Sequence, residues 1–177
     1  MEYIGQALPP VQLPGLGSVE QTCWDEFHNS SIRLFAAIDS RLKLVAGITL
    51  TDVRLLNLLA ASDYGCFRRS EICRALMVTP SRVTQLIRQL KIRRLVSQSA
   101  TPYDRRGIRV GITVAGRARL EAAQQIVAEV VRTHYLGGMS RPQMLMLAES
   151  HRRINARLDL RERSATFEDL VHDNSHS

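Results

Sequence analysis

The sequence predicts a mainly helical protein with one small β-hairpin, and three observations lead to this fold class. Apolar residues recur every three or four positions over most of the chain, which indicates amphipathic helices. Residues 95–112 depart from this period and resemble two strands joined by a turn. Capping residues and glycines divide the helical pattern into segments. We therefore expect four helices, the hairpin, and then two more helices.

The first of these helices is expected to be long and unusually apolar. Residues 1–17 are rich in Pro and Gly and are expected to form a flexible N-terminal arm. The helix begins near Ser18 and is expected to end at Gly47. So little sequence precedes its apolar stripe that another part of the protein must cover it.

Three shorter helices follow, each with a recognisable start. Thr51 is the predicted N-cap of the second helix and Ser70 that of the third. The pair Thr79-Pro80 predicts the start of the fourth, because a hydroxyl cap precedes a proline in the first helical position. The apolar stripe of this fourth helix consists of Val83, Leu86, Ile87 and Leu90.

The hairpin and two final helices complete the pattern. Residues 95–98 and 108–112 are the predicted strands. Thr113 then caps a helix that reaches about Tyr135. A capping box at Ser140 opens a last helix to about residue 161, and residues 163–177 are expected to be a loose polar tail.

Positive charge is concentrated in one third of the chain. The stretch from Arg68 to Arg119 holds 13 of the 24 Lys and Arg residues but only two of the 17 acidic ones. This asymmetry favours a polyanionic partner over general solubility. A solvated arginine-rich surface is the alternative.

Other classes of protein find little support in the sequence. No glycine-rich phosphate loop, HExxH motif or Ser/His/Asp grouping is evident, so we do not expect an enzyme or a cofactor. The cysteines and histidines lack the spacing of metal ligands, so no metal site is expected. Neither a leader nor an apolar run of about 18 residues is found. We expect a soluble cytoplasmic protein without membrane contact.

The capped fourth helix and the basic hairpin together resemble the MarR family of bacterial winged helix-turn-helix regulators. Residues 70–76 (SEICRAL) resemble the first helix of that family's motif, and residues 80–90 (PSRVTQLIRQL) resemble its recognition helix. The wing signature is matched by Asp104-Arg105-Arg106, followed by Ile112-Thr113 and Ala115-Gly116-Arg117. The resemblance covers roughly residues 50–158.

This resemblance implies a division of the chain into regions. Residues 48–113 would form the winged-helix DNA-binding domain. Residues 18–47 and 114–162 would form a helical dimerisation region, whose apolar faces a second copy of the chain covers. A symmetric homodimer implies a pseudo-palindromic operator in double-stranded DNA, with half-sites about 10 bp apart.

The fourth helix is expected to enter the major groove, where base edges can be distinguished. Arg82, Gln85 and Arg88 lie opposite the apolar stripe and are expected to reach bases. Ser81 and Thr84, near the helix N-terminus, are expected to hold phosphate. Solvated surface is the alternative for these side chains.

The hairpin is expected to act as the wing. Arg105, Arg106 and Arg109 surround its turn. By analogy with the family, Asp104 would orient an arginine while Arg106 enters the minor groove. A charged hairpin tip that only keeps the protein soluble is the alternative.

The sequence departs from the family pattern at two positions. Arg94 stands where the family has glycine before the first wing strand, so either the turn differs or Arg94 bears strain of about 1 kcal/mol in exchange for a phosphate contact. Cys73 stands in place of alanine, which indicates a small packed position.

Regulation is expected to come from a small aromatic or amphipathic effector, as is common in the family. The crevice where the first, second and fifth helices meet is the expected place, although core and dimer packing is the favoured alternative for the candidates. These candidates are Trp24, Phe27, His28 and Ser31.

The expected function is thus a sequence-specific DNA-binding transcriptional regulator, with repression as its mode. Alternatives are a redox-sensing regulator that uses Cys23 and a winged-helix module for protein contact.

Overall fold

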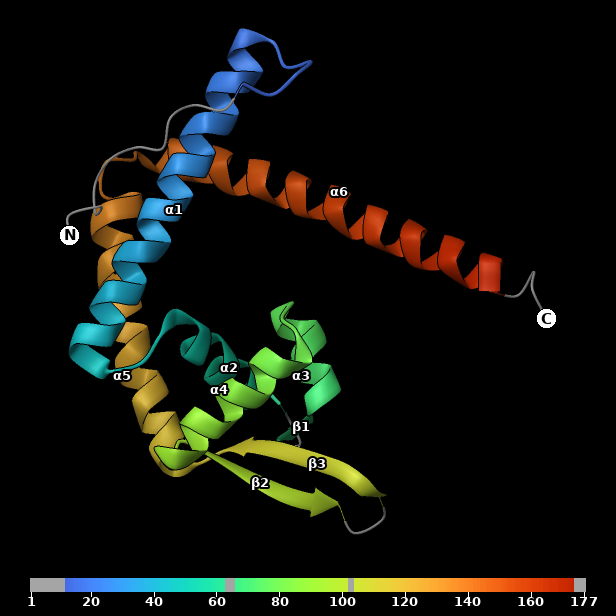
Figure 1. Cartoon of the computed structure of the whole chain (residues 1–177). Coiled ribbons are helices and arrows are strands. Elements are labelled where there is room, and N and C mark those ends of the chain that lie inside the picture. Colours follow the sequence, from blue (N-terminus) through green and yellow to red (C-terminus); the bar gives the residue numbers. More distant parts are fainter. Residues whose placement is uncertain (1–11, 63–65, 102–103, 174–177) are drawn as a thin grey trace. The chain divides into compact units, whose positions relative to one another are not determined.

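The computed structural model describes residues 12–62, 66–101 and 104–173, with side chains left out for residues 100–108 and 160–173. The chain falls into two compact units, one ending at Tyr135 and one starting at Leu136 (Figure 1). The prediction of a mainly helical fold with a small β-hairpin is confirmed. Within the described ranges, no helix has the length and apolar character needed to cross a membrane.

The centre of the first unit is a three-helix group beside a small antiparallel sheet. The sheet order is β1-β3-β2, so the third strand in sequence lies in the middle. β1 was not expected from the sequence, and β2 and β3 extend further towards the turn than predicted. The elements are α2 (Leu50–Ala60), β1 (Cys66–Arg68), α3 (Arg69–Leu76), α4 (Pro80–Ile92), β2 (Val96–Thr101) and β3 (Asp104–Ile112).

The apolar stripe of α4 forms part of the core, as its spacing predicts. Its four apolar side chains are each no more than 1% exposed. They pack with Leu55, Leu56 and Leu59 of α2 and with Val110 of β3, all of which are fully buried. This burial fixes which face of α4 is left for solvent.

Two helix starts differ from the prediction. Thr49, not Thr51, caps α2: its Oγ1 accepts the Asp52 amide at 3.1 Å, and Asp52 Oδ2 accepts the Thr49 amide at 2.9 Å. Arg68, not Ser70, is the N-cap residue of α3, and Glu71 Oε2 accepts its amide at 2.6 Å. In both cases the acidic residue three positions on completes the cap, and each cap lies two residues before the predicted one.

The predicted starts of α4 and α5 are confirmed. Thr79 Oγ1 accepts the Arg82 amide at 3.4 Å, with Pro80 in the first turn. Thr113 Oγ1 accepts the Gly116 amide at 2.9 Å at the start of α5 (Val114–Val130). The predicted helix to about Tyr135 is not α-helical throughout, because a π-helical turn, η1 (Val131–Leu136), follows α5.

The first helix, α1 (Ser18–Ala46), packs along α5 (Figure 1). It ends at Gly47, before the start of α2. Gly47 has φ +63°, the left-handed conformation that ends helices. At this junction Asp39 Oδ1 accepts the Leu50 amide at 2.8 Å, and Arg119 Nη1 donates to the Ala46 carbonyl at 2.8 Å. Side chains of α1 and α5 thus hold the connection to α2.

The second unit contains α6 (Arg141–Asp173). Gln143 Oε1 accepts the Ser140 amide at 2.8 Å, as the predicted capping box requires. The expected end of this helix near residue 161 is wrong, because the helical backbone continues to Asp173. Residues 163–173 were expected to be loose because they are polar, but polarity alone does not stop a helix that has no Pro or Gly in this stretch.

Candidate nucleic-acid interface

The exposed face of α4 is the first part of the candidate site. Because the apolar stripe is buried, the polar residues of the helix point to solvent, as predicted. All five of the predicted contact residues are exposed: Ser81, Arg82, Thr84, Gln85 and Arg88. The structure therefore presents these side chains together on one face, and their contact with DNA stays a prediction.

Hydrogen bonds within α4 and at its N-cap hold some of these side chains in place. Arg82 Nη1 donates to Gln85 Oε1 at 3.0 Å, so two groups suited to base edges lie against each other. Thr79 Oγ1 and Ser81 Oγ lie 3.1 Å apart at the helix start. The Thr84 hydroxyl donates to the Pro80 carbonyl at 3.0 Å, so its proton is already used within the helix.

The predicted wing is present as the β2–β3 hairpin. The strand β3 begins with three of the predicted contact residues, Asp104, Arg105 and Arg106. The structure describes their backbone but not their side chains. Their predicted roles, an oriented arginine and an insertion into the minor groove, therefore stay predictions. Arg109 is described, is partly buried and pairs with Ser99 of β2 in the middle of the hairpin.

Several hydrogen bonds fix the wing to the end of α4. Lys91 Nζ donates to Gln98 Oε1 of β2 at 3.1 Å. Arg94 has φ +58°, so it adopts the left-handed conformation in which the family uses glycine. The Thr113 hydroxyl donates to the Arg94 carbonyl at 2.8 Å. The end of α4, the hairpin and the start of α5 are thus joined at one point.

Sequence reasoning missed the contribution of β1. This strand is three residues long, too short for a period to be read, and it follows residues 63–65, which the structure does not describe. β1 brings Cys66 and Arg68 beside β3. Arg109 Nη1 donates to Cys66 Sγ at 3.5 Å. The only advance signal was the pair Arg68-Arg69 at the start of the basic stretch.

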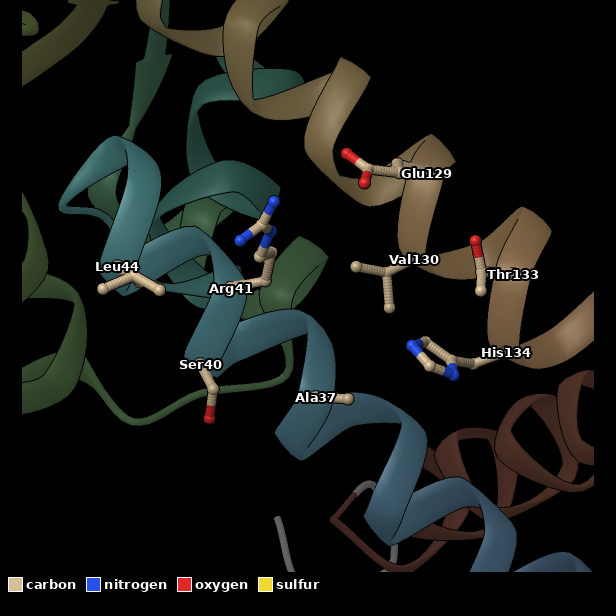
Figure 2. Close-up of a pocket in the computed structure, with 8 residues that line it drawn as sticks. All are labelled: Ala37, Ser40, Arg41, Leu44, Glu129, Val130, Thr133 and His134. Atoms are coloured by element: carbon tan, nitrogen blue, oxygen red, sulfur yellow. The ribbon is translucent and has the colours of Figure 1, made fainter.

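A cavity of about 410 Å³ lies between α1 and the segment formed by α5 and η1 (Figure 2). Its volume is in the range of small-molecule sites. Figure 2 shows Arg41 reaching from α1 towards α5, and His134 reaching back from η1 towards α1. Its lining combines apolar, hydroxyl, cationic and acidic side chains: Ala37, Ser40, Arg41, Leu44, Glu129, Val130, Thr133 and His134.

The predicted effector residues do not line this cavity, and lie earlier on α1. Trp24 stacks on His28 with ring centroids 5.6 Å apart, and the Trp24 and Phe27 rings lie 6.1 Å apart. Ser31 is partly buried nearby in sequence, one turn further along the helix. The structure thus gathers the three rings on the surface of α1, and their ligand binding stays a prediction.

The three cysteines are free thiols in different surroundings. Cys23 is exposed on α1, whereas Cys66 and Cys73 are partly buried. Cys73 packs against the core, in agreement with the small packed position expected for it. Among the described residues, no three His, Cys, Asp or Glu side chains gather in a way that could hold a metal ion.

Comparison with known proteins supports this geometry. The MarR family profile matches residues 46–107. The HTH-type transcriptional repressor NicR of Pseudomonas putida is 34% identical over 73 residues, which are 41% of this chain and 46% of the repressor. The chain thus matches less than half the length of this curated relative.

Solved structures extend the likeness to most of the chain. Sco3205 of Streptomyces coelicolor, a MarR family transcriptional regulator solved in complex with DNA, superposes with a TM-score of 0.73 and 24% identity over 81% of this chain and 90% of its own. BpsR of Bordetella bronchiseptica was studied for the regulation of its DNA binding by 6-hydroxynicotinic acid. It superposes with a TM-score of 0.64 and 21% identity over 76% of this chain and 98% of its own. At such identities the structures establish the fold. Over residues 46–107 the chain thus matches the MarR family profile, and its fold is the one seen in solved MarR family regulators.

Proposed function

We propose that this protein is a regulator that binds a specific sequence of double-stranded DNA as a homodimer. The observation that carries the proposal is the exposed polar and basic face of α4, joined through Lys91 and Gln98 to a basic hairpin. In this arrangement Arg82, Gln85 and Arg88 read the major groove while Arg106 enters the adjacent minor groove.

The exposed apolar residues of α1 support the homodimer. Val19, Trp24 and Phe35 are 81%, 43% and 56% exposed, which is unusual for large apolar side chains on one helix. A second copy would cover them in an isologous contact. The two recognition helices would then read a pseudo-palindromic operator.

Repression with release by an effector is the mode that we propose. The partly matching relative NicR carries the name of a repressor. The cavity between α1 and η1 combines apolar walls with Arg41 and His134, which suits a small aromatic or amphipathic effector. Asp39 of α1 accepts a hydrogen bond from the first residue of α2, so a movement of α1 reaches the winged helix. A ligand in the cavity shifts the winged helix only if it binds one arrangement of α1 more tightly than another.

The deciding experiment is a gel shift of the purified full chain on the DNA that flanks its own gene, across a salt series. We expect a discrete complex that survives nonspecific competitor and weakens steeply with salt, because each neutralised phosphate releases a counterion. Diffuse binding would call for selection from random DNA. Failure of that selection as well would contradict the proposal and favour a role in protein contact.

The exposure of Cys23 supports one variation, in which the same regulator senses oxidants. If Cys23 is the sensor, hydroperoxide releases the wild-type protein from DNA and leaves a Cys23→Ser variant bound. Equal responses of the two proteins would exclude this variation.

A further inference from the structure

The cavity between α1 and the α5–η1 segment is lined by groups of opposite charge that do not pair with each other. Arg41 lines it from α1, and Glu129 lines it from α5 (Figure 2). Both side chains are exposed, so a ligand can reach them. Elsewhere on α1 opposite charges do pair, since Lys43 Nζ and Asp39 Oδ2 lie 2.6 Å apart. Within the part of the chain that the structure describes, Arg41 and Glu129 make no hydrogen bond or ion pair.

The other lining residues provide polar groups and an apolar wall. The side-chain hydroxyls of Ser40 and Thr133 likewise make no hydrogen bond among the described residues. Apolar surface comes from Ala37, Leu44 and Val130. Val130 belongs to the buried core, and Ala37 packs against that core. A volume of about 410 Å³, which is in the range of small-molecule sites, thus combines both signs of charge with hydroxyls and an apolar wall.

The two charges act against each other on a ligand that carries charge of only one sign. A simple carboxylate is attracted by Arg41 but repelled by Glu129, and a simple amine meets the opposite forces. A ligand with one anionic and one cationic group satisfies both residues, and each pair then forms a charge-assisted hydrogen bond. The lining therefore favours a zwitterion by attraction and disfavours single charges by repulsion.

His134 adds a second donor for the anionic group of such a ligand. Figure 2 shows this side chain reaching from η1 towards α1, the helix that carries Arg41. An imidazole donates a hydrogen bond in its neutral and in its charged form. A carboxylate accepts several hydrogen bonds at once, so one carboxylate can bind to Arg41 and His134 together.

We propose that this cavity binds a free α-amino acid with an apolar side chain. The carboxylate of the amino acid pairs with Arg41 and His134, its ammonium group pairs with Glu129, and its side chain lies against Ala37 and Val130. The inference rests on the proposed function, because it names the chemical class of the effector for the same cavity. A residue within a peptide chain lacks these charged groups, so the site selects the free amino acid.

The test uses ligands that differ only in their charged groups. L-phenylalanine and L-leucine carry both charges. Hydrocinnamate and isocaproate lack the ammonium group, and phenethylamine and isoamylamine lack the carboxylate. Isothermal titration calorimetry measures the binding of each to the full chain without DNA. We expect each amino acid to bind about tenfold or more tightly than its two analogues, because each analogue loses a hydrogen bond between charged groups.

Neutral variants of the two charged residues locate the ligand. Glu129→Gln should weaken the binding of L-phenylalanine about tenfold or more and strengthen that of hydrocinnamate, whose carboxylate is no longer repelled. Arg41→Gln should also weaken L-phenylalanine but strengthen phenethylamine. A damaged fold would weaken all ligands alike, so these opposite changes report on charge. Glu121→Gln and Arg132→Gln, at exposed positions of α5 and η1 outside the lining, are the charge-matched controls and should bind like wild type.

Two outcomes would overturn the inference. The first is that the amino acids do not bind, or bind no more tightly than their singly charged analogues. The second is binding that Glu129→Gln and Arg41→Gln both leave unchanged, which would place the amino acid elsewhere. Gel shifts with and without L-phenylalanine test the proposed function separately. A chain that binds the amino acid through these residues but no DNA would contradict the proposed function alone, and a chain that binds operator DNA but no amino acid would contradict this inference alone.

Discussion

The backbone of Gly116, in the first turn of α5, lies directly against the carbonyl oxygen of Leu95, at the start of the wing. A β-carbon at position 116 would overlap this oxygen and would approach Ile112 Cγ1 to 2.8 Å. Because the obstacle is main chain, it cannot be relieved by turning a side chain. We expect Gly116→Ala to lower the free energy of unfolding by about 1–3 kcal/mol.

Urea denaturation measures this loss, and Gly138→Ala is its control. A β-carbon on Gly138 would meet no atom within 4 Å. We expect this control to stay within about 0.5 kcal/mol of wild type. Equal stability of the two alanine variants would contradict the proposed clash.

The carboxylate of Asp39 links α1 to α2, and its ionisation should appear in the stability of the protein. Burial alone would raise its pKa, but hydrogen bonds from Lys43 and from the Leu50 amide outweigh burial and hold the pKa of Asp39 below its ordinary value of 3.8. A lowered pKa in the folded state stabilises the fold above the unfolded-state pKa, and this gain is lost as the pH falls through the folded-state pKa.

We therefore expect Asp39→Asn to destabilise the protein by about 1 kcal/mol at pH 7. The difference from wild type should stay constant down to about pH 4 and shrink at lower pH. Denaturant midpoints across this range measure it. A difference that grows as the pH falls would contradict the assigned sign.

Arg94 bears the backbone strain that its left-handed conformation imposes. Arg94→Gly should raise the free energy of unfolding by about 1 kcal/mol, since glycine adopts φ +58° without a steric penalty. Arg93→Gly is the matched control, because Arg93 has φ −83° and should lose about 0.5–1 kcal/mol on substitution. If Arg94 also contacts phosphate, the stabilised variant binds DNA with a shallower salt slope. Destabilisation by Arg94→Gly would contradict the strain.

Arg82 is expected to read a base through the pair it forms with Gln85. Arg82→Ala should weaken operator binding by about 1–3 kcal/mol and relax the preference at one base pair. Selection of preferred sites by the wild-type and variant proteins measures this effect. A uniform loss over all sequences would instead assign Arg82 to phosphate.

The wing arginine is expected to act through the shape of the minor groove. Arg106→Ala should lower operator affinity at least tenfold, about 1.4 kcal/mol, with the largest effect at AT-rich flanks. Titration of operators with AT-rich and GC-rich flanks tests this expectation. Binding like that of wild type would remove the wing from the proposed contact.

Local signals in the sequence predicted most of the fold. The start of α4 at Thr79-Pro80 and that of α5 at Thr113 rest on hydrogen bonds within a single turn, so neighbouring residues determine them. The caps of α2 and α3 were misplaced because Thr51 and Ser70 are also good capping residues, and the choice depends on which acidic side chain closes the box. The π-helical turn after α5 had no signal of this kind.

The candidate site was predicted in part for the same reason. The exposed face of α4 follows from its period of apolar residues, which the structure confirms. The pairing of Arg68 with Arg109 joins positions 41 residues apart through a strand of three residues. Such a contact is set by tertiary structure, and no local pattern announces it.

The length of α1 gives the junction at Gly47 a mechanical consequence. The helix has 29 residues without a break, which makes it about 44 Å long. A tilt of about 5° at Gly47 would displace the far end, at Ser18, by about 4 Å. Because Asp39 lies close to this pivot and Ser18 lies far from it, a sub-ångström displacement of α1 near Asp39 and Arg119 corresponds to a displacement several times larger at Ser18.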